Sequence, residues 1–248
     1  MDIVELCTQF TEWNPSWLQT LNAQVYYVPV TVGGMLSKPM DQTLYFFTSV
    51  FCLLCSFYLK TLKDERSKKL FSIVTGTLAN FYCFGRLSLF SAFQNILCYA
   101  MMVGMPANVQ HLAVFVTSAF TLGAAQLAKQ LYNPGENGLD LTMALMFNFC
   151  KVTSLTICVR DGLVIKQKGV ENSRLKKREI AYAHTGEVPS FFDYWSYMYF
   201  CGASISGPFY EFKDFQMYMK SEAHYAKIPS TLAPTLMRVV NLVCFIFF

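Results

Sequence analysis

Long uncharged stretches dominate the distribution of hydrophobic and polar residues along this chain. Between Leu87 and Ala128 there is no Lys, Arg, Asp or Glu at all. One membrane-spanning helix needs about 20 mostly apolar residues, so this stretch alone is long enough for two spans. A soluble protein cannot hide an uncharged run of that length on one face of a helix. The pattern therefore predicts an integral membrane protein built from helices, because backbone in lipid must satisfy its own hydrogen bonds.

The whole chain reads as a series of hydrophobic segments separated by charged loops and turn residues. The expected segments run over residues 43–59, 70–85, 87–105, 111–131, 141–159, 189–210 and 239–248. The second is short and contains Asn80, so a tilted or re-entrant helix fits it as well as a span does. Residues 1–42 are interpreted as an N-terminal interfacial segment, and residues 43–248 as the transmembrane region. The expected fold class is all-α and polytopic, with about six to seven hydrophobic segments.

Two basic loops test this division into segments. Residues 60–69 carry five bases and two acids, and residues 160–188 carry seven bases and four acids. Lys and Arg concentrate in cytoplasmic loops, so both loops should lie on the cytoplasmic side. They do so only if an even number of spans separates them, which requires that 70–85 and 87–105 be separate helices. The acidic turn at 132–140 then lies on the opposite side.

Composition agrees with a membrane protein and excludes several other classes. Hydrophobic residues make up 54% of the chain and charged residues 15%, whereas soluble domains carry about 25% charged residues. The net charge of +4 is modest and orients the loops, so no nucleic-acid partner is predicted. The nine cysteines lack metal-ligand spacing, and we interpret them as small buried residues. No metal site is predicted.

Three charged residues stand out as candidates for a functional site. Lys151 lies inside the segment 141–159, where a charge costs about 2.5–3.5 kcal/mol on the insertion scale. It could form the wall of a polar cavity that contacts an anionic group, or snorkel, or pair with Asp193 or Asp140. Asp161 follows Arg160 at the end of the same segment and could form an interfacial pair with it. Asp193 lies near an expected helix start, where the helix dipole favours an acid.

No catalytic residue can be assigned from the residues alone. The chain has three histidines, His111, His184 and His224, and none has a Ser, Cys or acid at a diagnostic spacing. The last apolar run, 239–248, is too short to cross a bilayer of about 30 Å. We therefore expect that the chain is truncated or that a partner completes its last helix.

The chain carries a set of motifs, most of them in its second half, that resembles the membrane-bound O-acyltransferase family. Lys151 lies in a span that ends in Asp161-Gly162, and after a loop comes a Pro189-Ser190 opening. The remaining matches include Thr75-Gly76, Gly207-Pro208 followed by aromatic residues, Lys227-Ile-Pro-Ser-Thr and Pro234-Thr-Leu-Met-Arg238. Together they resemble the lysophospholipid acyltransferases, in particular the lysophosphatidylcholine type. The resemblance covers residues 43–248 and reaches only the N-terminal half of the family, so an incomplete O-acyltransferase fold is expected.

This resemblance implies an activity and its participants. Such enzymes move a fatty acyl chain from acyl-CoA to a lysophospholipid hydroxyl in the endoplasmic reticulum membrane. Acyl-CoA is then a co-substrate rather than a bound cofactor. The implied partners are membrane lipids, lysophospholipid and acyl-CoA, with a second copy of the chain as a further candidate.

The resemblance also assigns catalysis to residues that this chain does not match. The family uses a buried His as general base and an upstream Asn, both expected beyond Phe248. The 248-residue chain alone is therefore expected to be inactive, and no catalytic residue is assigned in it. A non-catalytic protein that modulates a full-length relative is the main alternative, and a small transporter is a weaker one. The residues expected to line the substrate chamber, or alternatively to be packing and interfacial anchors, are Lys151, Asp161, Asp193, Tyr194, Tyr197 and Tyr199.

Overall fold

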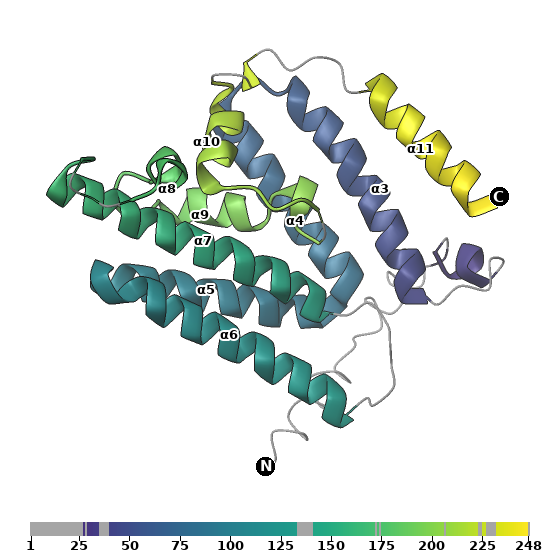
Figure 1. The fold of residues 1–248 in the computed structure, drawn as a ribbon. Helices are drawn as coiled ribbons and strands as arrows, with labels where there is room; N and C mark the ends of the chain where they lie inside the picture. Colours follow the sequence, from purple (N-terminus) through teal and green to yellow (C-terminus); the bar gives the residue numbers. More distant parts are fainter. Residues whose placement is uncertain are drawn as a thin grey trace.

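The computed structural model describes residues 27, 29–34, 40–132, 141–171, 173, 175–205, 207–222, 225–226 and 232–247. Regular structure in these residues is helical throughout, which confirms the expected fold class (Figure 1). The long helices are α3 (Met40–Thr61), α4 (Glu65–Phe84), α5 (Ser88–Gly104), α6 (Ala107–Tyr132), α7 (Leu141–Lys168) and α11 (Leu232–Phe247). The short elements are η1 (Gly85–Leu87), α8 (Lys177–Tyr182), α9 (Phe191–Met198), η2 (Cys201–Ala203) and α10 (Phe212–Lys220).

Four stretches of the described chain are long and apolar enough to cross a membrane. They are Gln42–Thr61, Glu65–Gly104, Asn108–Leu131 and Leu141–Lys168. The second of them contains both α4 and α5, which meet at η1, where Gly85 adopts a positive φ of 55°. A residue with a side chain is strained in that conformation, so glycine allows the chain to turn there. The expected separation of 70–85 and 87–105 into two helices is therefore correct.

Two helices extend beyond their predicted bounds. Helix α4 begins at Glu65, because Asp64 caps it by accepting a hydrogen bond of 2.9 Å from the Ser67 backbone N–H. Helix α7 continues from the predicted end at residue 159 to Lys168. Its last turn contains the good helix formers Lys166, Gln167 and Lys168, and lysine near a helix C-terminus is favoured by the helix dipole. Part of the predicted cytoplasmic loop 160–188 is thus helical.

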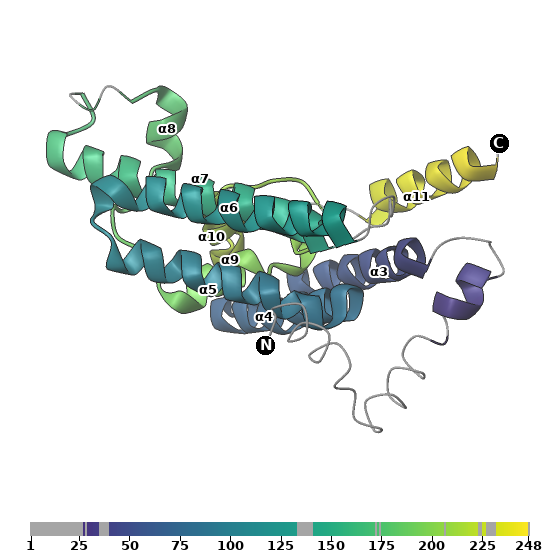
Figure 2. The same cartoon turned by 90° about the horizontal axis from the view of Figure 1, so that it is seen from below.

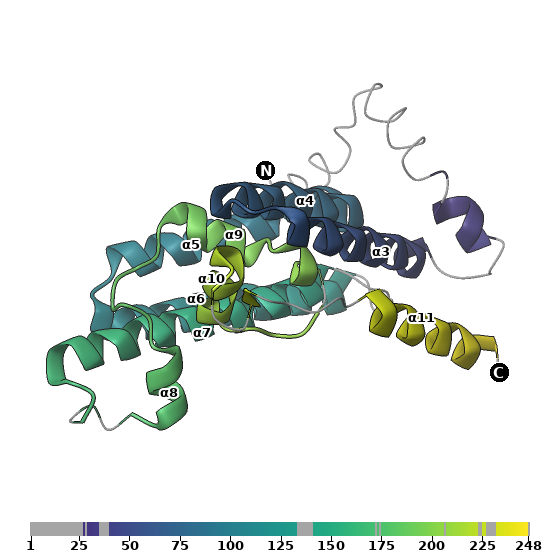
Figure 3. The ribbon, with the colours of Figure 1, turned by 90° about the horizontal axis from the view of Figure 1, so that it is seen from above.

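The long helices form two groups with short elements between them. Helices α5, α6 and α7 lie side by side, and α3 packs along α4. Figure 2 shows α5, α6 and α7 running alongside one another, with α8 next to the C-terminal end of α7. The short elements α9 and α10 lie between α4 and α7 in Figures 1 and 3. Helix α9 contacts α4, α5 and α7, whereas η2 contacts α3 and α4.

The predicted hydrophobic segment 189–210 is not a spanning helix. Among its described residues the only α-helix is α9, whose eight residues rise about 12 Å, far less than the roughly 30 Å of a hydrocarbon core. The segment is apolar because it is buried among other helices rather than because it faces lipid. At the C-terminus, α11 begins at Leu232, earlier than the predicted 239. The described residues do not include most of residues 1–42, the turn at 133–140 with Asp140, or His224.

Candidate functional site

Residues 189–221 form a segment that enters the helix bundle and leaves it on the same side, and we call it the re-entrant segment. It contains α9, η2 and α10 in that order. Helix α9 begins where the Ser190 hydroxyl accepts a hydrogen bond from the Asp193 backbone N–H. Its backbone contacts the middle of α4, where the Tyr199 carbonyl lies against Gly76. Non-helical backbone at membrane depth is tolerated only where protein groups satisfy it, so its polar partners decide whether this segment is stable.

Lys151 supplies those partners at the innermost turn of the re-entrant segment. Its side chain is only 2% exposed, and its Nζ donates hydrogen bonds to the carbonyls of Ala203 at 2.8 Å and Met198 at 3.1 Å. The Tyr210 ring centroid lies 5.2 Å from the same nitrogen. Carbonyls at helix ends have no partner within their own helix, and the ammonium group provides one. The pair with Asp193 that the sequence allowed is absent, because Asp193 contacts Lys69.

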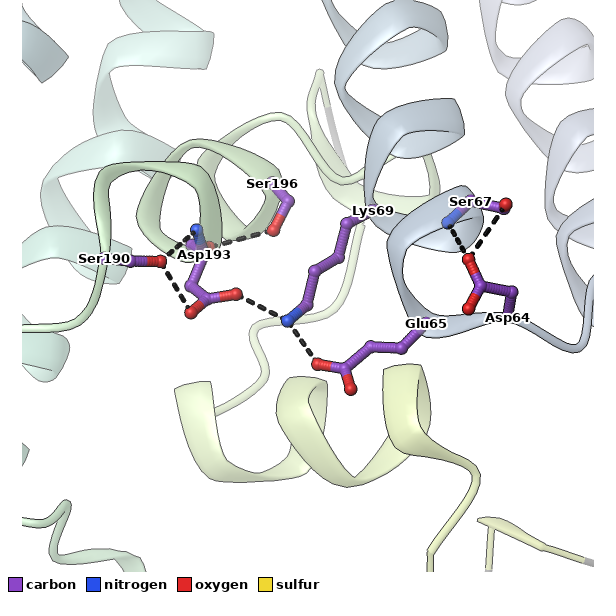
Figure 4. Close-up of polar contacts among 7 residues, drawn as sticks. All are labelled: Asp64, Glu65, Ser67, Lys69, Ser190, Asp193 and Ser196. Carbon is purple, nitrogen blue, oxygen red and sulfur yellow. Dashed lines mark hydrogen bonds and ion pairs between the residues drawn. The ribbon is translucent and has the colours of Figure 1, made fainter.

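Two adjacent lysines on the first turn of α4 hold the two ends of the re-entrant segment. Lys69 Nζ lies 2.5 Å from an Asp193 carboxylate oxygen and also contacts the Glu65 carboxylate (Figure 4). Lys68 Nζ donates to the Ser221 hydroxyl at 2.6 Å. Both lysines are buried. Sequence reasoning missed this role, because Lys68 and Lys69 look like ordinary bases of a cytoplasmic loop.

Asp193 is ionised in this arrangement. Partial burial by itself raises the pKa of its carboxyl group, but the contacts with the Lys69 ammonium and the Ser190 hydroxyl outweigh burial and hold the pKa below its usual range. The Ser190 hydroxyl donates to the second carboxylate oxygen at 2.7 Å. Both oxygens of Asp193 therefore have partners within the protein, as Figure 4 shows.

The candidate tyrosines use their hydroxyl groups inside the protein. The Tyr194 hydroxyl donates to the Asn95 carbonyl at 2.9 Å. The Tyr197 hydroxyl donates to the Tyr210 carbonyl at 3.0 Å, and the Tyr210 hydroxyl donates back to the Tyr197 carbonyl at 3.1 Å. Tyr194 and Tyr197 are fully buried. These contacts fix the shape of the re-entrant segment and tie it to α5.

Asp161 lies apart from the other candidates, toward the C-terminal end of α7. Ten residues separate it from Lys151, which corresponds to about 15 Å along a helix. It is buried beside Gly162, where a methyl group would lie 1.6 Å from the His184 carbonyl oxygen. The structure therefore gathers Lys151, Asp193, Tyr194 and Tyr197 on or against the re-entrant segment and leaves Asp161 outside this group.

A second polar region lines the inner face of α5. Ser91, Gln94 and Asn95 are buried there, while Leu89 and Phe93 on the same helix are exposed. The Asn148 side chain on α7 donates to the Ser91 hydroxyl at 2.8 Å. Both amide atoms of Gln94 are buried without a hydrogen-bond partner among the described residues. The helix thus has its polar face inward and its apolar face outward, as expected for a membrane helix that borders a polar interior.

The spacing of polar residues in the sequence indicates the inward polar face of α5, although the hydropathy of the segment does not. The three-to-four-residue spacing of one helix face is followed by Ser88, Ser91 and Asn95. Gln94, next to Asn95, borders the same face. The mean hydropathy of the segment indicates only that it is apolar enough to span a membrane, because averaging removes the difference between its two faces.

Comparison with known proteins relates this architecture to a group of lipid-modifying enzymes. No family profile matches the chain. Over 152 residues it is 30% identical to lysophospholipid acyltransferase 6 of Drosophila melanogaster, covering 61% of this chain and 20% of the fly protein. Over 178 residues it is 30% identical to lysophospholipid acyltransferase 2 of Arabidopsis thaliana, covering 69% of this chain and 36% of the plant protein.

A human protein extends the similarity to a third lineage. The chain is 24% identical over 200 residues to human membrane-bound glycerophospholipid O-acyltransferase 2, covering 78% of this chain and 37% of the human protein. The chain therefore spans about a fifth to two fifths of the length of these relatives. Over the aligned parts it is a homologue of lysophospholipid acyltransferases and membrane-bound O-acyltransferases, as its sequence motifs indicated.

Proposed function

We propose that this chain forms a membrane-embedded, lipid-holding part of a lysophospholipid acyltransferase of the endoplasmic reticulum. Such an enzyme joins a fatty acyl group from acyl-CoA to the hydroxyl of a lysophospholipid. The observation that carries the proposal is the similarity to named acyltransferases over 61–79% of the chain. The buried polar face of α5, enclosed by apolar helices, supports it, because both substrates are amphiphiles whose polar atoms need partners inside the membrane.

Gln94 is the residue that we assign to the polar part of the amphiphile. A buried amide without a partner costs about 1–3 kcal/mol, so a membrane helix that keeps one has a use for it. A carboxamide both donates and accepts hydrogen bonds, which suits an ester carbonyl or a lipid hydroxyl. Lys151, Tyr194 and Tyr197 then act indirectly, by holding the re-entrant segment in place against α5 and α7.

Substitution of Gln94 by leucine separates this role from a role in folding. Leucine removes the buried unpaired amide, so the thermal stability of the chain should stay the same or rise. Cross-linking of a photoreactive lysophospholipid to α5 should fall about tenfold, since a hydrogen bond to a buried group is lost. Peptide mapping by mass spectrometry after irradiation in microsomes measures both the site and the yield.

Gln130→Leu is the matched control, because Gln130 is exposed near the end of α6 and outside the polar region. Equal cross-linking yields from Gln94→Leu, Gln130→Leu and the unaltered chain would contradict the assignment of Gln94. An unfolded Gln94→Leu variant would do so as well, because the assignment requires that the amide be dispensable for folding.

We further propose that the 248 residues do not transfer acyl groups by themselves. Of the two histidines described, His111 has an unpaired Nδ1, and His184 packs edge-on against Phe212. Neither donates to or accepts from a hydroxyl, thiol or carboxylate among the described residues. Burial lowers the pKa of His184 below its usual value despite the nearby acids Asp193 and Glu187. The general base that the family resemblance implies matches neither of them.

Acyl transfer in microsomes from a host without this activity tests the second proposal. A labelled polyunsaturated acyl-CoA and a panel of lysophospholipids are supplied, with the full-length human relative as the positive control. We expect no product above background from the 248-residue chain. A clear product would overturn the proposal and require substitution of His111, His184 and His224 in turn. A reduced rate of the relative on co-expression would favour the modulator function instead.

A further inference from the structure

A recess of about 510 Å³ opens beside the beginnings of α4 and α9. Its size lies within the roughly 300–1,000 Å³ range of small-ligand pockets. Four charged side chains line it, from Glu65, Arg66, Lys69 and Asp193. Leu70 and Phe192 form its apolar margin, and both are exposed. None of the roles described so far uses Arg66 or the apolar margin.

The contacts within the recess leave one positive and one negative group open. Lys69 is neutralised by two carboxylates, and both oxygens of Asp193 are occupied by Lys69 and Ser190. Glu65 uses one oxygen for Lys69, and no hydrogen bond or ion pair engages its second oxygen among the described residues. Among the described residues, no hydrogen bond or ion pair engages the Arg66 guanidinium. The open groups are therefore the Arg66 guanidinium and one Glu65 oxygen, on adjacent residues.

We propose that this recess binds a phosphate–ammonium zwitterion, with Arg66 on the phosphate and Glu65 on the ammonium group. The proposal rests on the proposed function, since this zwitterion is the headgroup chemistry of one class of lysophospholipid. A guanidinium presents two parallel donors that match a phosphate edge. A purely anionic ligand would lie beside the carboxylate of Glu65 with nothing to neutralise it, whereas the ammonium group of a zwitterion offers a cation to the open Glu65 oxygen.

The location of the recess fits a lipid headgroup. The candidate span Glu65–Gly104 begins at the recess, which places the charged groups at the level of the membrane surface. Leu70 and Phe192 continue from the charged groups along an apolar surface that can accept the first carbons of an acyl chain. An aromatic ring such as Phe192 also attracts an alkylated ammonium group.

Binding to the purified full chain in detergent tests the proposal with three labelled or competing ligands. They are lysophosphatidylcholine, free phosphocholine, and lysophosphatidic acid, which lacks the ammonium group. Arg66→Gln should weaken lysophosphatidylcholine binding about tenfold, since a charge-assisted contact is lost. Glu65→Gln should weaken lysophosphatidylcholine several-fold and leave lysophosphatidic acid unchanged or bound more tightly. If phosphocholine competes with lysophosphatidylcholine and Arg66→Gln abolishes this competition, the free headgroup is sufficient for binding. If phosphocholine does not compete, the recess requires the whole lipid.

Lys63→Gln is the matched control, because it removes the same charge from an exposed position outside the recess. Equal affinities of Arg66→Gln and Lys63→Gln would overturn the proposal. So would an equal effect of Glu65→Gln on both lipids. Arg66→Gln loses no hydrogen bond or ion pair among the described residues, only an electrostatic interaction with the exposed Asp64, and should unfold at nearly the same temperature as the unaltered chain. If the recess variants behave like the control but Gln94→Leu still loses cross-linking, only the assignment of the recess fails. A chain that binds no lysophospholipid at all contradicts the proposed function as well.

Discussion

Replacement of Gly76 by alanine is expected to lower the free energy of unfolding by about 3 kcal/mol or more, because the added methyl group has no room. An ideal Cβ at this position would lie 1.9 Å from the Tyr199 carbonyl oxygen and 2.7 Å from its carbon. Both atoms belong to the backbone, so no side-chain rotation relieves the overlap. The re-entrant segment must move away from α4, and its innermost turn then loses the contacts that Lys151 provides.

Thermal unfolding in detergent and thiol labelling measure this effect together. Cys201 in η2 is only 1% exposed, so it should become reactive in Gly76→Ala while it stays protected in the unaltered chain. Gly123→Ala is the control, since no atom lies within 4 Å of a Cβ on that glycine of α6. It should be neutral or stabilising by up to about 1 kcal/mol, because alanine favours a helix more than glycine does. Similar behaviour of the two variants would mean that α4 and the re-entrant segment are not in close contact.

The spanning helices could be predicted from the sequence because their signal is local. An uncharged run such as that from Leu87 to Ala128 leaves few alternatives to helices in a bilayer. The positive loops added a non-local argument for separating 70–85 from 87–105, and the chain does form two helices there, α4 and α5. Hydropathy fails at 189–210, because lipid and a protein interior are equally apolar. Only the length of α9 and the contacts of its neighbours distinguish the two environments.

The charged part of the candidate site could not be predicted, because its partners are distant in the sequence. Lys69 meets Asp193, which lies 124 positions further along the chain, and Lys68 meets Ser221, 153 positions further. Nothing in the sequence around either lysine indicates burial. Lys151 was identified as anomalous for the right reason, a charge inside an apolar helix. Its partners are backbone carbonyls, which any residue possesses and no side-chain pattern reveals.

Substitution of Lys151 by methionine is expected to cost about 2–4 kcal/mol of unfolding free energy. Methionine fills a similar volume, but the carbonyls of Met198 and Ala203 lose their donor in a site that excludes water. Removal of a buried charge offsets part of this loss. The loss of unfolding free energy should therefore be smaller than for a substitution that also leaves a large cavity. Lys168→Met, at the exposed end of α7, should change stability by less than about 0.5 kcal/mol.

The same variant decides between the two interpretations of Lys151 that its sequence position allowed. If the ammonium group instead contacts an anionic part of acyl-CoA, Lys151→Met should keep its stability and lose acyl-CoA binding. If it holds the re-entrant segment, stability should fall, Cys201 should become reactive, and acyl-CoA binding should fall only as far as the fraction of folded protein does. The three carbonyls within 3.5 Å of its Nζ favour the second outcome, since they already surround the positive charge. A buried lysine in a membrane helix therefore need not mark a substrate site, provided that backbone carbonyls satisfy it.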